Sequence, residues 1–355
     1  MTDNRPDATC DEPTSTARTR EPDYHAMVPL SVAPMMDYTD RHFRRILRPL
    51  TRHTLFYTEM INANAIVRGG RLEQLAFDAE EHPVALQLGG DDPNTLAEAS
   101  RIAEDLGYRE INLNIGCPSD RVLKGRFGAC LMAEPEHVGV MVQAIQARVQ
   151  IPVTVKHRIG IDDIDQYEHM KNFVDVVSAA GCRSFIVHAR KAWLKGLSPK
   201  QNRMVPPLRH DEVHRLKAER PDLYVATNGG IRTLDEARAH LDHVDSVMIG
   251  RAAYDTPWIF ASADSAIFGA EQDPYETRRD FLEDTFAIFA DHLSRGQRFH
   301  TLGRHLLGLY HGCANSRRWK QGLASLGQSS DPAVLADFRA LVASMREELA
   351  RHDAA

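Results

Sequence analysis

Residues 111–119 read Ile-Asn-Leu-Asn-Ile-Gly-Cys-Pro-Ser, an alternating apolar run that stops abruptly at Gly116-Cys117-Pro118. Alternation with a period of two predicts a β-strand over 110–115. Glycine permits a turn and proline removes a backbone donor, so Cys117 is expected just beyond the end of that strand. A free cysteine is more often a small buried hydrophobe, but the flanking glycine and proline favour a thiol presented as a reactive group.

Strand-like runs of similar length recur along the chain. They cover residues 28–33, 54–58, 84–88, 110–115, 152–157, 184–188, 223–227 and 245–249. Amphipathic helix patterns separate most of them, for example 93–107 after Asp92, 134–149 with Pro135 in its first turn, and 233–242, where Thr233 and Glu236 have capping-box spacing. Eight short strands alternating with helices predict an α/β fold of the (β/α)8 TIM-barrel type. A doubly wound sheet usually has fewer strands, and no G-x-G-x-x-G motif follows any of these.

The chain divides into three parts. Residues 1–25 are rich in Asp, Thr, Arg and Pro and are predicted to form a disordered N-terminal tail. After Trp258 the strand patterns cease, and residues 274–350 hold only helical patterns, such as 279–294 and 332–350. We therefore expect a barrel domain over 26–265, followed by a small all-helical C-terminal domain over 274–355.

The composition is ordinary for a soluble globular protein: of 355 residues, 43% are hydrophobic and 26% are charged. No apolar run approaches the ~18 residues of a membrane span, and the N-terminus lacks the apolar stretch of a signal peptide. The five cysteines are few, odd in number and widely spaced, which predicts free thiols in a reducing cytoplasm. No Cys-x-x-Cys or paired Cys/His spacing indicates structural zinc.

The distribution of charge points to a polyanionic partner, although the net charge is −6. Two long segments, 183–210 and 292–330, contain several lysines and arginines and no acidic residue. Acid-free basic segments in an acidic protein are typical of local anion-binding faces. The alternative is that both are simply solvated basic stretches.

Polar residues and glycines gather where the predicted strands end, which is where barrel enzymes carry their chemistry. They are Asp37, Glu59, Gln87, Asn114, Cys117, Lys156, Arg158, His188, Arg190, Asn228, Gly229, Gly230, Gly250 and Arg251. One such residue is easily a satisfied core group. Because all eight predicted strands end in such a residue, the pattern predicts a functional site at the strand ends.

The last two strand ends favour a phosphate. Barrel enzymes often bind phosphate in the loops after strands seven and eight, where Asn228-Gly229-Gly230 and Gly250-Arg251 supply small residues and a cation. Gln87, Lys156 and His188 add groups that suit the polar edge of a planar heterocycle. A phosphate joined to such a ring describes flavin mononucleotide (FMN).

A metal-dependent hydrolase is the competing interpretation. His157 and His188, with Lys156 and Asp37 nearby, are possible metal ligands. However, Lys156 and His157 are neighbours on one strand and should point to opposite sides of it. The acidic run over 162–168 also suggests a cation site, but it opens a helical pattern, where acids need no metal to explain them.

Several motifs resemble the tRNA-dihydrouridine synthase family. They are Ala33-Pro34-Met35, Gln87, Asn114-Ile-Gly-Cys-Pro-Ser119, Lys156, His188-Ala-Arg-Lys191, Asn228-Gly-Gly230 and Gly250-Arg251. The stretches GCPSDRVLKGRFGACLM (116–132) and HARKAWLKGLSPKQNR (188–203) are similar to the subfamily that acts on uridines 20 and 20a of tRNA. The resemblance runs from about Val28 to about Gly322.

This resemblance implies a role for individual residues. It implies FMN contacts from Ala33, Pro34, Met35, Gln87, Lys156, His188, Asn228, Gly229, Gly230, Gly250 and Arg251. Cys117 matches the proton donor of the family. Asn114, Lys200 and Arg203 match positions that touch tRNA, and Arg317 and Lys320 fall where C-terminal residues contact it. The family takes its electrons from NADPH, with NADH also possible, and the resemblance implies no metal and no obligate protein partner.

The implied reaction suits a thiol. Reducing the 5,6 double bond of uracil requires a hydride at C6 and a proton at C5. Free thiols have a pKa of about 8.5, so they are mostly protonated at neutral pH yet acidic enough to protonate an enolate. The target base must be turned out of the folded tRNA, which is recognised largely by its shape, phosphates and 2′-hydroxyls. The rivals are a flavin enzyme with a small substrate and a tRNA-binding protein with a vestigial barrel.

Overall fold

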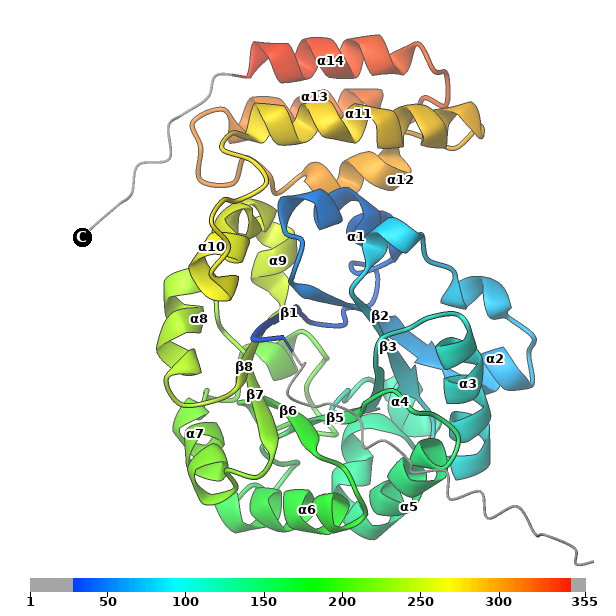
Figure 1. Cartoon of the computed structure of the whole chain (residues 1–355), viewed down its shortest axis with the longest axis vertical. Helices are drawn as coiled ribbons and strands as arrows, with labels where there is room; N and C mark the ends of the chain where they lie inside the picture. Colours follow the sequence, from blue (N-terminus) through cyan, green and yellow to red (C-terminus); the bar gives the residue numbers. More distant parts are fainter. Residues whose placement is uncertain (1–27, 346–355) are drawn as a thin grey trace, which may run out of the picture.

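The computed structural model describes residues 28–345, so the predicted tail over 1–25 and the last part of the predicted helix over 332–350 lie outside the described residues. Eight parallel strands form a closed barrel in sequence order, and the first strand pairs with the last. The predicted TIM barrel is therefore confirmed, and helices surround it (Figure 1). The strands are β1 (Leu30–Val32), β2 (Leu55–Asn62), β3 (Val84–Gly89), β4 (Ile111–Ile115), β5 (Val153–Arg158), β6 (Ser184–His188), β7 (Tyr224–Asn228) and β8 (Ser246–Ile249).

Strand β2 is the one that departs most from its prediction, because it continues to Asn62 instead of ending at residue 58. Its register against β3 shifts between Tyr57 and Met60. Such an irregularity re-aims the side chains that follow it, so the alternation that marks a strand in the sequence is lost at that point.

The outer helices follow the strands in the predicted alternation. They are α1 (Arg41–Leu47), α2 (Ala63–Val67), α3 (Pro93–Asp105), α4 (Asp120–Lys124), α5 (Pro135–Gln146), α6 (Tyr167–Ala179), α7 (His210–Glu219), α8 (Leu234–Leu241), α9 (Arg251–Asp255) and α10 (Ala263–Phe268). Asp92 caps α3 by accepting from the N–H of Thr95, and Thr233 caps α8 by accepting from the N–H of Glu236. The second half of the expected capping box differs, since the Glu236 carboxylate accepts from the N–H of Arg232.

After α10 the described chain is helical, as predicted. The last helices are α11 (Arg278–Ser294), α12 (His300–Gly303), α13 (Ser316–Leu326) and α14 (Val334–Ser344). Figure 1 shows them in layers beside the barrel, with α12 next to α1 and α14 outermost. Trp319 on α13 is fully buried, and its indole N–H donates to the oxygen of Leu306 at 2.7 Å.

These C-terminal helices share an apolar core with one side of the barrel. A single cluster of buried side chains includes Leu30 of β1, Phe43 of α1 and Val247 of β8 together with Phe281 and Phe338 of α11 and α14. Ion pairs cross the same boundary, for example between Arg45 and Asp291 at 3.0 Å. Burial of this area makes the helical part and the barrel depend on each other for stability. Within residues 28–345, no helix combines the length and the apolar character needed to cross a bilayer.

Candidate active site

Cys117 lies at the carboxyl end of the barrel, in the loop between β4 and α4, as predicted. The Asn114 side chain accepts from the N–H groups of Gly116 at 3.1 Å and Cys117 at 2.9 Å, which closes the turn. The carbonyl oxygen of Cys117 accepts from the N–H of Ala129 at 3.0 Å. Gly128 has a φ of +77°, and a Cβ there would lie 2.6 Å from that same oxygen. The thiol is half-buried and held on a fixed loop.

Arg158 ties the Cys117 loop to the loop that follows β6. Its guanidinium donates to the backbone oxygens of Gly116 at 2.8 Å, Lys191 at 3.0 Å and Asn202 at 3.2 Å. Burial lowers the pKa of Arg158 to about 10, and nearby Cys117 partly offsets this effect. The sequence places Arg158 at a strand end but gives no sign of this role. Its only signal is a third basic residue, after Lys156 and His157, at the end of a predicted strand.

Lys156, His188 and Asn228 come together from three neighbouring strands. The Lys156 Nζ lies 3.3 Å from the Asn228 Oδ1, and the Asn228 Nδ2 donates to the Met248 oxygen at 2.7 Å. Burial, followed by the positive charge of Arg158, lowers the pKa of Lys156 to about 7. The same two causes hold the pKa of His188 well below its usual range. Protonation of Lys156 and His188 in this pocket is therefore unfavourable without a neighbouring anion, which is the property of a site suited to an anionic ligand.

The predicted alternation along β5 is confirmed. Lys156 reaches Asn228, whereas His157 lies on the other side of the strand, with its ring 4.9 Å from that of Phe173 on α6 and its Nδ1 2.7 Å from the Arg158 oxygen. His157 and His188 therefore do not share a metal, and the hydrolase interpretation is wrong. Across residues 28–345, no group of three or more His, Cys, Asp or Glu side chains is arranged to hold a metal ion.

The backbone conformation explains why glycine occupies both positions after β7, which the sequence did not reveal. Gly229 and Gly230 have φ values of +119° and +77°, which side chains rarely adopt. A Cβ on Gly229 would lie 2.6 Å from the His188 ring, and one on Gly230 would lie 2.5 Å from Leu208. The expectation that both simply leave room for a ligand is therefore incomplete. Gly250 is different, because a Cβ there would meet only the Ala33 Cβ, at 3.9 Å.

The loop after β1 lies beside Gly250. The Ala33 N–H donates to the Ile249 oxygen at 2.8 Å, which continues the pairing of β1 with β8 beyond the last strand residue. Pro34 and Met35 follow, and the Thr39 hydroxyl accepts from the Met35 N–H at 2.9 Å. The first and the last predicted strand ends thus meet, as a closed barrel requires.

Lys200 and Arg203 are exposed on the loop after β6. Arg251 lies against this loop, with its Nη2 3.5 Å from the Arg203 oxygen. Partial desolvation of its guanidinium, and then the charge of Arg251, lowers the pKa of Arg203. The structure therefore joins a residue predicted to bind tRNA with one predicted to bind the cofactor.

Part of the basic segment 183–210 is neutralised by acids from elsewhere in the chain. Asp165 pairs with Lys191 at 3.0 Å and with Arg209 at 3.7 Å, and Glu212 pairs with Arg209 at 3.2 Å. Asp165 belongs to the acidic run that suggested a cation site, so the cations it holds are the protein's own. The number of positive charges available to a partner is smaller than the sequence implies.

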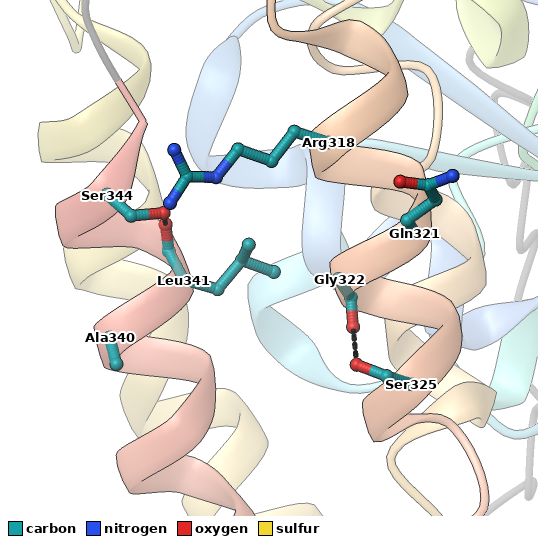
Figure 2. A pocket seen from close by; sticks show the side chains of 7 residues that line it. All are labelled: Arg318, Gln321, Gly322, Ser325, Ala340, Leu341 and Ser344. Carbon is teal, nitrogen blue, oxygen red and sulfur yellow. Dashed lines mark hydrogen bonds between the residues drawn. The ribbon is translucent and has the colours of Figure 1, made fainter.

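Arg317 and Lys320 are exposed on α13, and no contact of the described residues joins them to the barrel mouth. Arg318 lies between them and lines a shallow groove between α13 and α14, where Figure 2 shows its side chain reaching toward Ser344. Gln321, Gly322, Ser325, Ala340 and Leu341 complete the groove. Among residues 28–345, Arg317, Arg318 and Lys320 take part in none of the ion pairs.

Comparison with known families and proteins found several similarities. The model of the dihydrouridine synthase family matches residues 31–345. A tRNA-dihydrouridine(20/20a) synthase of Synechocystis sp. is 54% identical over 309 residues, which cover 86% of this chain and 92% of that protein. The tRNA-dihydrouridine(20/20a) synthase of Escherichia coli strain K12 is 48% identical over 338 residues, covering 94% of this chain and 96% of that protein.

Among solved structures, a complex of 2-naphthoyl-CoA reductase with 2-naphthoyl-CoA superposes with a TM-score of 0.53 and 9% identity, over 66% of this chain and 49% of that chain. At that identity the match supports the fold alone. The family match spans nearly all of the described chain, and both relatives are aligned over most of their length. The chain therefore belongs to the dihydrouridine synthase family of flavin-dependent oxidoreductases.

Proposed function

We propose that the chain reduces uridine to 5,6-dihydrouridine in the D-loop of tRNA, at positions 20 and 20a, with FMN as cofactor and NADPH as electron source. The relatives at 54% and 48% identity are named as tRNA-dihydrouridine(20/20a) synthases. The observation that supports it most directly is the Cys117 loop. Asn114 and Arg158 hold Cys117 at the strand ends that also carry Lys156.

The donor set at the barrel mouth fits FMN. Arg251 supplies positive charge, a bound anion would favour the charged form of Lys156, and burial and neighbouring cations disfavour the charged form of His188. The N–H groups of Gly230 and Gly250 donate no hydrogen bond to another of the described residues, so they are available to a phosphate. We assign FMN contacts to Ala33, Pro34, Met35, Gln87, Lys156, His188, Asn228, Gly229, Gly230, Gly250 and Arg251.

When bound, FMN accepts electrons from NADPH and supplies a hydride to C6 of the uracil ring. Cys117 holds the proton for C5, because it stands on a loop at the mouth where a flipped-out base would enter. A positioned acid of this kind accelerates a reaction by roughly 10²–10⁴. Asn114 fixes the direction of the thiol by closing the turn around it, and its own amide lies at the same strand end.

The polyanionic partner is the tRNA itself. We assign tRNA contacts to Lys200 and Arg203, exposed on the loop after β6, and to Arg317 and Lys320, exposed on α13. Contacts of this type recognise the shape and the phosphates of a folded RNA. The identity of the base is then recognised only where the reacting uracil binds. The base has to leave its stack to reach Cys117, and the enzyme must offset the energy of that unstacking.

The direct test is to incubate the full chain, loaded with FMN, with unmodified tRNA and NADPH and to measure dihydrouridine by mass spectrometry of nuclease fragments. We expect a gain of two hydrogens for each uridine reduced in the fragment containing positions 20 and 20a. A matched tRNA with cytidine at both positions should show none. If the protein binds FMN and oxidises NADPH but leaves every tRNA unchanged while reducing a small enone, it is a small-substrate flavin enzyme. If it binds tRNA but no FMN, the barrel is vestigial.

A further inference from the structure

A continuous chain of hydrogen-bonded side chains runs through the barrel interior beneath the Cys117 loop. The Asn114 Nδ2 donates to the Gln87 Oε1 at 2.8 Å, and the Gln87 Nε2 donates to the Asn112 Oδ1 at 2.7 Å. The Asn112 Nδ2 donates to the Thr154 hydroxyl at 2.8 Å, and that hydroxyl donates to the Glu110 Oε1 at 2.5 Å. The chain thus links the turn around Cys117 to a carboxyl group.

Every hydrogen bond in this chain is donated in the direction from Asn114 toward Glu110, and the groups at its two ends explain this common direction. At the top, backbone N–H groups can only donate, so the oxygen of Asn114 must face them and its NH₂ must face Gln87. At the bottom, Oε1 of Glu110 accepts from Thr154 and also from the Tyr57 hydroxyl, at 2.6 Å. Burial raises the pKa of Glu110 to about 7, while these hydrogen bonds lower it. An oxygen of this group accepts in either protonation state.

The weak point of the chain is the hydroxyl of Thr154, which is able to donate or accept. If it donated to Asn112, the amide of Asn112 would have to turn its NH₂ toward the NH₂ of Gln87, and two donors would face each other. The Glu110 oxygen at 2.5 Å, much closer to the hydroxyl than the Ile111 oxygen at 3.5 Å, is the acceptor that disfavours this second arrangement. All members of the chain below Asn114 are at most 2% exposed, so water does not offer an alternative partner.

We propose that Glu110 is a positioning residue of the active site, which acts through Thr154 and Asn112 to fix the orientation of the Gln87 amide at the cofactor. This inference rests on the proposed function, because that proposal assigns Gln87 to FMN. Glu110 touches neither the cofactor nor the base. Through this chain, Glu110 keeps one N–H and one oxygen lone pair of the Gln87 amide in hydrogen bonds within the barrel. The other N–H and the other lone pair of the amide then remain for the flavin.

The sharpest test uses Thr154, because two substitutions there differ in the hydroxyl. Thr154→Val keeps the shape and breaks the chain, whereas Thr154→Ser keeps the hydroxyl. We expect the full chain with Thr154→Val to bind FMN about three- to tenfold more weakly, which is the affinity that one hydrogen bond is worth. Its bound-flavin absorption bands should shift. Thr154→Ser should bind within about twofold of the wild type and show the wild-type bands.

Glu110 itself supplies a second pair. Glu110→Gln retains an oxygen that accepts from Thr154 and should behave like the wild type, whereas Glu110→Leu should resemble Thr154→Val. Tyr57→Phe is the matched control, because it removes an equally buried donor to the same oxygen but lies outside the path to Gln87. If Tyr57→Phe weakens FMN binding as much as Thr154→Val, Glu110 serves the core as a whole and the proposal is overturned.

A measurement without flavin separates this proposal from the proposed function. In the full chain without FMN, NMR of the labelled Gln87 side-chain amide should show faster hydrogen exchange in Thr154→Val than in Thr154→Ser. Equal exchange in the two variants would overturn the positioning role. If the amide responds as expected but the wild type binds no FMN, the positioning stands and the proposed function fails.

Discussion

The guanidinium of Arg251 lies 3.5 Å from the backbone oxygen of Arg203, so the cation assigned to the FMN phosphate touches the loop assigned to tRNA. The side chains of the two arginines are also close enough for the charge of Arg251 to lower the pKa of Arg203, in addition to the larger effect of partial desolvation. Like charges that lie close together repel each other unless an anion lies near both. We expect a phosphate bound near Arg251 to reduce this repulsion.

This contact separates the roles of two neighbouring cations. Lys200→Ala should weaken tRNA binding and reduce its salt dependence by about one released counterion, with FMN affinity unchanged. Arg203→Ala should weaken both tRNA and FMN binding. Titrations with tRNA at several salt concentrations and with FMN check this. Lys171→Ala is the matched control, since Lys171 lies on α6 and pairs with Asp175 at 2.6 Å. An Arg203→Ala protein with wild-type FMN affinity would contradict the coupling.

Cys117→Ala should slow dihydrouridine formation by roughly 10²–10⁴, the usual worth of a positioned acid, while FMN stays bound and is still reduced by NADPH. Single-turnover assays on tRNA, alongside NADPH oxidation without tRNA, separate the two half-reactions. Cys182→Ala is the control, because burial raises the pKa of that thiol to about 12 and it lies away from the mouth. Near-normal product formation by Cys117→Ala would remove the thiol from the mechanism.

The barrel is predictable because its strands are short, apolar and regularly spaced, so that even their ends follow from the pattern to within about two residues, apart from β2. The part of β2 beyond residue 58 is not predictable, because a register shift between Tyr57 and Met60 breaks the period of two. The choice between Lys156 and His157 is also predictable, since alternation alone places them on opposite sides of β5.

Contacts between distant segments are not predictable. In the sequence, Asp165 resembles part of a cation site. Only the fold shows that its carboxylate forms ion pairs with Lys191 and Arg209. Glu110 is the first residue of the predicted strand over 110–115 and directly precedes β4, where a carboxylate in the sequence usually indicates a solvated strand end. Its burial follows from the closure of the barrel, which brings Tyr57 and Thr154 from other strands to the same oxygen.

Lys156 makes the stability of the protein depend on pH. Its pKa is about 7 in the folded chain without a ligand, whereas an unfolded lysine has a pKa of about 10.4. Between these values the unfolded chain binds more protons, so stability without FMN should rise as pH increases from about 7 to 10. Lys156→Met should flatten this part of the curve, measured by urea unfolding, and Lys171→Met should not. Parallel curves for Lys156→Met and the wild type would disprove the assignment.

The tRNA role of the helical part is best tested by point substitutions, because α11–α14 share a core with β1, β8 and α1 and their removal would expose that core. Arg317 and Lys320 are suited to this, since both are exposed on either side of Trp319, which is fully buried.

Replacing both residues by Ala should therefore leave the midpoint of thermal unfolding and the FMN affinity unchanged. The variant should bind tRNA more weakly, and the slope of log affinity against log salt should fall by about two, because each cation that neutralises a phosphate releases about one counterion. A double variant of Arg101 and Lys171, which removes the same charge from the outer helices α3 and α6, controls for net charge. If the two double variants weaken tRNA binding equally, α13 contributes only long-range charge. If only the Arg317 and Lys320 variant changes the slope, the phosphates of tRNA contact α13 directly.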